Sequence, residues 1–154
     1  MSSFRFYLFP AAIAAALVLA ATAAPQAVPA GWKVVKDRKA VCQVAVPADW
    51  IADKIMITDL TAPDKKSKAT MGAKPAGVTY AEIVKMAKDM FKPGKSFDDS
   101  ANRTWFVETA TTGKKTAWYA VVNTSPVCEV QVEFQDAAFE ADAKKIVESL
   151  GKAK

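Results

Sequence analysis

The chain has 154 residues and a formal net charge of +5, with 51% hydrophobic and 24% charged residues. This length and composition fit a single globular domain, and they exclude both a disordered protein and a membrane-spanning helix bundle. Histidine is absent, so the usual general base near neutral pH and the commonest metal ligand are missing, which excludes most familiar active sites.

The amino-terminal segment has the three parts of a secretory leader. Arg5 is the only charged residue before Lys33, and residues 6–21 form an apolar stretch. The small residues Ala21-Thr22-Ala23 fit a signal peptidase and predict cleavage after position 23. A permanent transmembrane anchor is the alternative, but a spanning helix would carry bulky apolar or aromatic residues at this end. We therefore expect a secretory signal peptide at 1–23 and a periplasmic or secreted bacterial protein without stable membrane insertion.

Residues 24–154 are expected to form one domain that begins with short strands. Alternating or β-branched runs at 32–36 and 39–46 indicate two strands joined by a polar turn around Asp37. A further short strand is expected at 55–60. Residues 61–77 are rich in Lys, Pro, Gly, Ser and Thr, and this composition predicts the longest loop of the domain.

An amphipathic helix is expected at Tyr80–Phe91. Thr79 and Glu82 form a capping box at its start. Pro93-Gly94 ends it, because the residue before a proline avoids the helical region and glycine supplies the left-handed exit. Apolar residues recur at helical spacing and predict a buried stripe of Tyr80, Ile83, Val84, Ala87, Met90 and Phe91.

A β-hairpin is expected where the runs 104–109 and 116–123 flank Thr112-Gly113. Side chains of a strand alternate between its two faces. One face is expected to carry Trp105, Val107, Trp118, Ala120 and Val122, and the other Phe106, Ala117, Tyr119 and Val121. Because both faces are apolar, a helix, a partner or a ligand must cover each of them.

The carboxyl-terminal part predicts one more strand and a second helix. In the strand at 127–134, Glu129, Gln131 and Glu133 alternate with apolar residues, so one face is half solvated. Asp136 caps the helix, and its apolar stripe is Phe139, Ala143, Ile146, Val147 and Leu150, with Gly151 at its end. The order of elements predicts an α+β fold with a mainly antiparallel sheet flanked by helices.

Cys42 and Cys128 are the two cysteines of the chain, and we expect one disulfide between them. Both alternate with apolar residues in their strands, so both sulfurs should be buried. The bridge would enclose 85 residues, which the chain-entropy model values at about 4–5 kcal/mol. A redox-active pair is the alternative, but catalytic dithiols usually lie close together at an exposed helix start.

A strand ending Val44-Ala45-Val46-Pro47-Ala48-Asp49-Trp50, followed much later by a helix closing Ile146-Val147-Glu148-Ser149-Leu150, resembles the PsbP-like superfamily. That group contains extrinsic photosystem subunits, small exported bacterial proteins and a Ran-binding nuclear transport factor. The resemblance covers the first strands and the last helix. It implies an antiparallel sheet packed between helices, no catalysis, and a role in docking or assembly. The cysteine pair is not carried over from the family, and no functional residue is transferred.

No catalytic residue, metal site or cofactor is predicted. Without histidine, neither a Ser-His-Asp arrangement nor a carboxylate–histidine metal site can be built. Paired carboxylates would still permit a small carboxylate-dependent envelope hydrolase. Its candidate residues are Glu129 and Glu133 on one strand face, or Asp98 and Asp99 beside the hairpin. We expect these groups to be solvent-facing charges instead, because acidic pairs are common on any surface.

Basic residues are concentrated in residues 65–95, which contain eight lysines and two acidic residues. The residues expected to bind a partner are Lys65, Lys66, Lys68, Lys85, Lys88, Lys92 and Trp118. The lysines would attract an anionic envelope component or a protein through a positive field. Alternatively they form a solvated surface that only keeps the protein in solution. A nucleic-acid partner is not expected, because no exposed stacking motif accompanies the lysines.

These features together predict a secreted or periplasmic non-enzymatic accessory or binding module that acts through protein or envelope-surface contacts. The carboxylate hydrolase is one alternative, and it requires a deep cleft in which Glu129 or Glu133 faces another carboxylate. An inhibitor of another secreted protein is the second alternative, and it would present a rigid protruding loop.

Overall fold

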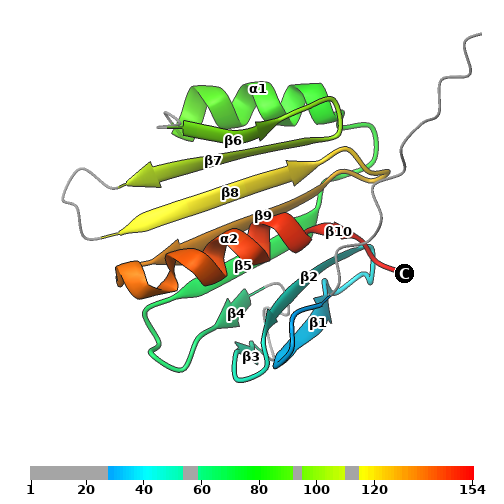
Figure 1. The fold of residues 1–154 in the computed structure, drawn as a ribbon. Helices are drawn as coiled ribbons and strands as arrows, with labels where there is room; N and C mark the ends of the chain where they lie inside the picture. Colours follow the sequence, from blue (N-terminus) through cyan, green and yellow to red (C-terminus); the bar gives the residue numbers. More distant parts are fainter. Residues whose placement is uncertain (1–27, 54–58, 92–94, 110–114) are drawn as a thin grey trace, which may run out of the picture.

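The computed structural model describes residues 28–53, 59–91, 95–109 and 115–154. These residues form an α+β fold with two antiparallel sheets and two α-helices, which confirms the predicted fold class (Figure 1). The elements are β1 (Trp32–Lys36), β2 (Cys42–Pro47), β3 (Ile51–Ala52), β4 (Asp59–Thr61), β5 (Lys68–Ala73), α1 (Tyr80–Phe91), β6 (Lys95–Asp99), β7 (Arg103–Thr109), β8 (Thr116–Val122), β9 (Cys128–Phe134), a 3-10 turn (Ala137–Phe139), α2 (Glu140–Ser149) and β10 (Gly151–Lys152).

The larger sheet has seven strands in the order β3-β4-β5-β9-β8-β7-β6, and the smaller sheet has the order β1-β2-β10. Neighbouring strands are antiparallel throughout both sheets. Strands β6 to β9 follow one another as a meander, whereas β5 comes from before α1 and joins the free edge of β9. Helix α1 therefore connects two strands that lie four positions apart in the sheet.

The two faces of the larger sheet are covered by different elements. Helix α2 and strand β2 pack on one face, around a core that includes Trp50, Trp105 and Trp118. Helix α1 packs on the other face, where Ile83 and Ala87 are buried. The molecule thus has three layers, with the larger sheet in the middle (Figure 1).

The hairpin strands β7 and β8 bury both of their faces, as their alternation predicts. Trp105 and Trp118 belong to the core under α2, while Phe106 and Tyr119 belong to the core under α1. Register pairs such as Phe106 with Tyr119 confirm the antiparallel pairing of the two runs. The expected turn at Thr112-Gly113 lies outside the described residues, as do Pro93-Gly94 and the leader.

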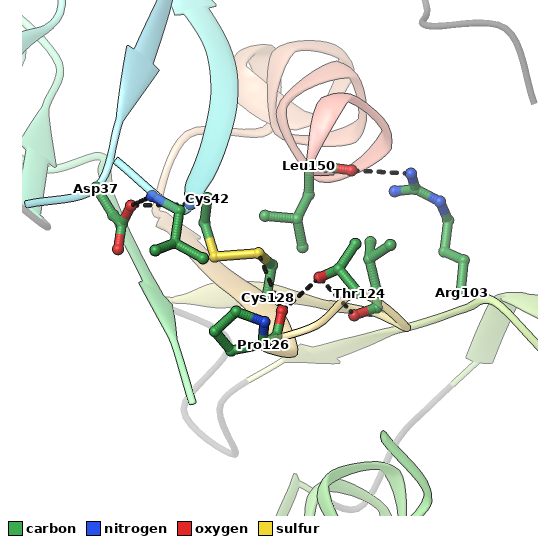
Figure 2. The surroundings of a disulfide bond; sticks show 9 residues. Asp37, Cys42, Arg103, Thr124, Pro126, Cys128 and Leu150 are labelled. Atoms are coloured by element: carbon green, nitrogen blue, oxygen red, sulfur yellow. Dashed lines mark hydrogen bonds between the residues drawn. A yellow bond between two sulfur atoms is a disulfide. The ribbon is translucent and has the colours of Figure 1, made fainter. Parts of the chain in front are cut away.

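The predicted disulfide is present and joins the two sheets. Cys42 of β2 and Cys128 of β9 are both fully buried, and their sulfurs are bonded. Figure 2 shows this bond beside Asp37, a buried carboxylate that accepts the backbone N–H of Cys42 at 2.8 Å and of Val41 at 2.7 Å. The carboxylate therefore fixes the turn between β1 and β2 and with it the position of the first cysteine.

Arg103 ties the end of α2 to the larger sheet. Its guanidinium donates to the carbonyl of Leu150 at 3.0 Å (Figure 2). It also donates to the carbonyl of Val147 at 2.9 Å. The last carbonyls of a helix have no partner within the helix, and cations stabilise this end. Asp136 caps the 3-10 turn Ala137–Phe139 that precedes α2, because its side chain accepts the N–H of Ala138 at 2.9 Å. The expectation that it caps the helix itself is wrong, since α2 begins at Glu140 and its N-cap, Phe139, makes no side-chain hydrogen bond.

The prediction of a loop over residues 61–77 is wrong, because this segment contains β5 and the end of β4. Ala69 and Met71 are buried, whereas Lys68 and Thr70 are exposed. The side chains of β5 alternate between buried and exposed, as in a half-buried strand. The buried residues, Ala69 and Met71, are not β-branched or aromatic, so the sequence indicated a strand only weakly. Pairing with β4 and β9 outweighs this weak local preference.

Two further boundaries differ from expectation. Asp98 and Asp99, expected beside the hairpin, lie in β6, an edge strand with a β-bulge between Ser96 and Asp98. The strand expected at 55–60 is observed as β4, Asp59–Thr61, and residues 54–58 lie outside the described residues. Within the described ranges, neither helix has the length and apolar character that crossing a membrane requires.

Candidate functional site

The predicted lysines divide between two regions of the surface. Lys65 and Lys66 lie in the turn between β4 and β5, and Lys68 begins β5. Lys85 and Lys88 lie on α1, beside β6. Strands β9, β8 and β7 separate β5 from β6, so four strand spacings of about 4.8 Å put these two strands about 19 Å apart, and the two groups of lysines lie at different edges of the molecule. Lys92 lies outside the described residues.

A groove of about 420 Å³ runs between α1 and the edge of the larger sheet. Its lining residues are Tyr80, Ala81, Val84, Lys85, Lys88, Asp89, Asp99, Ser100 and Thr104. The Tyr80 hydroxyl lies 2.6 Å from the hydroxyl of the buried Thr104 and donates to the carbonyl of Ser100 at 3.1 Å. The capping box holds the start of this helix, because Glu82 accepts the N–H of Thr79 at 2.8 Å. These bonds fix the helix at the amino-terminal end of the groove.

The charges around this groove are balanced. Lys88 donates to Asp99 at 3.0 Å, and Thr104 donates to the other oxygen of that carboxylate at 3.1 Å. The hydrogen bond from Lys88, supported by that from Thr104, holds the pKa of Asp99 below its ordinary value. Lys85 and Asp89 also line the groove, so its lining holds two lysines and two aspartates. The excess of lysines along residues 65–95 is therefore not an excess of positive charge in the groove.

Two methionines on the opposite flank of α1 are exposed. Met86 is 41% and Met90 is 62% exposed, so the expectation that Met90 belongs to the buried stripe is wrong. Lys88 contacts β6, and residues 88 and 90 lie about 200° apart around a helix. The methionine flank therefore faces away from β6. In the sequence, the (i, i+4) spacing of Met86 and Met90 already indicated that both methionines lie on one flank of the helix.

A second hollow, of about 400 Å³, lies at the other edge of the larger sheet. It is lined by Ile51, Asp53, Thr61, Ala62, Pro63, Lys65 and Lys68. Two of the predicted lysines thus meet here, next to Ile51, which is 69% exposed. Lys66 is exposed on the same turn, and the backbone of this turn is held by Asp64, which accepts the N–H groups of Lys66 and Ser67.

The side chain of Trp118, one of the residues expected to bind a partner, is buried. Only 2% of it is exposed, and it packs against Trp105 with ring centroids 5.4 Å apart. Phe97 of β6 covers both rings, at 5.2 Å from Trp118 and 4.7 Å from Trp105. Phe97 is itself 40% exposed and has Lys95 over its ring at 5.3 Å. The sequence did not show what covers this face of the hairpin, and in the structure Phe97 covers it.

The carboxylates proposed for hydrolysis are each paired with a cation. Glu129 binds Lys74 at 2.5 Å and accepts the Tyr119 hydroxyl, while Glu133 is paired with Lys115. The hollow beside Glu129 contains no second carboxylate in its lining. Asp98 and Asp99 are likewise paired, with Arg103 at 3.8 Å and with Lys88. Within the described ranges, acidic groups and cysteines nowhere gather in the threes that would hold a metal ion.

Comparison with known proteins supports the fold. No family model and no curated protein sequence matches the chain. The solution structure of cyanobacterial PsbP (CyanoP) from Synechocystis sp. PCC 6803 superposes with a TM-score of 0.51 and 8% identity, covering 80% of this chain and 94% of that chain. The resemblance to the PsbP-like superfamily is thus confirmed as a resemblance of fold.

A second solved structure is that of LpqN, described as involved in cell envelope biogenesis of Mycobacterium tuberculosis. It has a TM-score of 0.39 and 16% identity, covering 83% of this chain and 82% of that chain. This superposition is too loose to support an inference about the present chain.

Proposed function

We propose that the chain is an exported, non-enzymatic binding module that docks on a protein partner through the outer surface of α1. Residues 1–23 act as the leader, and residues 24–154 work as one domain in the periplasm or outside a bacterial cell. The leader pattern, the buried disulfide and the pairing of the carboxylates support this proposal. The likeness to CyanoP supports the fold on which it is built.

The exposure of Met86 and Met90 carries the proposal. Helix α1 buries Ile83 and Ala87 against the sheet, yet it leaves these two methionines in solvent, with the exposed Glu82 and Asp89 one helical turn from Met86. Exposed apolar groups rimmed by charges mark interaction surfaces. Methionine is suited to such surfaces, because its flexible, polarizable side chain adapts to a partner.

A protein partner fits this surface better than an anionic lipid or polysaccharide does. Lys85 and Lys88 alternate with Asp89 and Asp99 around the groove. A uniformly anionic surface would be repelled by the two aspartates, whereas a protein can present charges of both signs in a complementary pattern. Lys65, Lys66 and Lys68 are proposed as a separate basic region that assists approach or solubility.

Site-specific photo-crosslinking tests the docking surface. A photoreactive phenylalanine analogue at position 90 should yield a defined crosslinked protein in intact cells. The same analogue at Val34, which is 43% exposed on β1, is the matched control and should not yield that product. Reversal of Lys85 and Lys88 to glutamate should reduce the product about tenfold, which corresponds to about 1.4 kcal/mol of binding energy.

Charge reversals elsewhere separate the two lysine regions. Lys65→Glu with Lys66→Glu, or Lys144→Glu with Lys145→Glu on α2, should leave the crosslink from position 90 unchanged. Equal crosslinking from positions 34 and 90 would overturn the proposed surface. Binding to vesicles of phosphatidylglycerol that is lost only with the Lys85 and Lys88 reversals would replace the protein partner with an anionic envelope component.

The export step has its own test. Intact mass measurement of protein recovered from the periplasm or medium should give a chain that begins at Ala24 and weighs two hydrogen atoms less than the reduced chain, because a disulfide has formed. An intact amino end, or two free thiols, would contradict export followed by oxidation.

A further inference from the structure

Part of one face of the larger sheet is left open beside α1. Helix α1 packs on Tyr119 and Val121 of β8. Beyond β8, the strands β9 and β5 turn Gln131 and Thr70 to the same side as Tyr119, as the register pairs Tyr119 with Gln131 and Gln131 with Thr70 show. A hollow of about 240 Å³ lies here, lined by Thr70, Met71, Gly72, Tyr119, Glu129 and Gln131.

Gly72 forms the floor of this hollow, and nothing in the fold requires a glycine there. A Cβ atom added to it would meet no atom within 4 Å, and its φ lies outside the left-handed range that favours glycine. Glycine inside a strand weakens the strand, because it loses more conformational freedom and packs no side chain. Glycines inside strands often mark a β-bulge, a tight bend, or a place where a ligand or another chain approaches the backbone closely. The register of β5 with β9 is continuous through Gly72, so no bulge accounts for this glycine.

The polar groups around the hollow are neutral or paired. Glu129 is bonded to Lys74 and accepts the hydroxyl of Tyr119, and Gln131 donates to Glu133 at 3.0 Å. Burial, together with the neighbouring Glu129 carboxylate, raises the pKa of Tyr119, so its hydroxyl remains a donor. A charged ligand would find no uncompensated charge here. The hydroxyl of Thr70 and the carboxamide of Gln131 can each donate and accept hydrogen bonds.

We infer that this hollow is a second binding site, which takes one ring of a neutral, hydroxyl-rich carbohydrate. Its volume is below the roughly 300–1,000 Å³ of sites for drug-sized ligands, so one ring fits and the remainder of a glycan lies outside. The ring lies over the bare backbone of Gly72, with sugar hydroxyls bonded to Thr70, Gln131 and Glu129. Hydroxyl groups satisfy such mixed donors and acceptors, whereas an apolar group would leave them unpaired. The site does not depend on docking through α1.

Nuclear magnetic resonance of the exported, disulfide-bonded protein tests this inference. Cellotriose and chitotriose are the neutral probes, and a trimer of galacturonic acid is the charged probe. The neutral probes should shift the amide signals of Thr70 and Gly72 and the side-chain amide of Gln131 progressively, with a Kd of about 1 mM. Signals of α1 residues at the Lys88 groove should not move.

Gly72→Val supplies the decisive variant, because the Cβ atom that it adds meets no atom within 4 Å and its branched side chain extends from β5 at a position that lines the hollow. It should weaken the binding of both neutral probes at least about tenfold, while the melting temperature stays the same or rises. Gln131→Leu should weaken binding with the hollow left open. Ala48→Val, in an exposed turn, is the matched control and should bind as the unchanged protein does.

Three outcomes would overturn the inference. One is the absence of shifts at Thr70, Gly72 and Gln131 with both neutral probes. Another is unchanged binding in Gly72→Val. The third is a response to the galacturonic acid trimer alone, which would assign the hollow to an anionic ligand. Each of these outcomes leaves the crosslinking result for α1 untouched, so the two proposals fail separately.

Discussion

Removal of the Cys42–Cys128 disulfide should destabilise the folded domain by about 4–5 kcal/mol, because a loop closed by residues that far apart loses this much chain entropy in the unfolded state. The two cysteines are 86 positions apart and both are fully buried. Domains of this size are typically stable by about 5–15 kcal/mol. The disulfide therefore accounts for a large share of the stability, and the variant lacking it should be close to unfolding at 37 °C.

Urea unfolding of Cys42→Ala, Cys128→Ala and the double variant measures this loss. Each single variant removes the same bond, so the double variant should lose little more than either single one, and the free energies should be strongly non-additive. The slope of the unfolding free energy against urea should also increase, because the unfolded chain without the bond is less compact.

Two results would refute this reasoning. A loss below about 1 kcal/mol would show that the unfolded chain gains little freedom when the bond is absent. Additive losses in the two single variants would show that the buried sulfur atoms act through their separate packing contacts and that the bond between them contributes little. Reduction of the unchanged protein provides a control, because it breaks the bond and leaves both sulfurs in the core.

Helix ends provide the remaining predictions. Arg103→Met should destabilise the domain by about 1.5–3 kcal/mol in urea unfolding, because it removes two charged hydrogen bonds to the last turn of α2. Arg103→Lys should recover only part of this stability, because one ammonium group cannot match the two-pronged geometry of the guanidinium. Thr79→Ala should cost about 1 kcal/mol by loss of the helix cap; no change in urea midpoint would contradict the cap. Hydrogen bonds from Thr79 hold the pKa of Glu82 below its ordinary 4.5, so its contribution is complete above pH 4.5 and is lost as the pH falls through the lowered pKa. Glu82→Gln should flatten the acid limb of a stability–pH curve, and an unchanged limb would exclude this group as a cause.

Local sequence patterns were enough to predict those elements whose defining residues lie within a few positions of one another. The helix predicted at Tyr80–Phe91 has these bounds in the structure, because the capping box at Thr79 and Glu82 satisfies its first N–H groups. The two faces of the hairpin followed from alternation alone. Cys42 and Cys128 were paired correctly because two cysteines allow one connectivity.

The order of strands lay beyond local patterns. Strand β5 pairs with β9, which follows it by more than fifty residues and three other strands. Nothing in the sequence of β5 predicts that β9 is its neighbour. The net charge of each surface region was also beyond prediction from local patterns. Counting along the chain gives residues 65–95 an excess of lysine, yet Lys88 is neutralised by Asp99 and Lys74 by Glu129, both outside that segment. A surface potential depends on pairs that only the fold brings together.

Gly72 links the missed strand to the proposed carbohydrate site. Its presence among Lys68–Ala73 is one reason that the segment has the composition of a loop, because glycine is depleted in strands. Places where local rules fail without a structural reason are often functional, since the protein retains a destabilising residue there. If this holds at Gly72, Gly72→Ala should stabilise the domain by about 0.5–1 kcal/mol in urea unfolding while it weakens the binding of cellotriose. A Gly72→Ala variant that is less stable than the unchanged protein would mean that the glycine serves the fold, and the argument for a ligand over this strand would lose its basis.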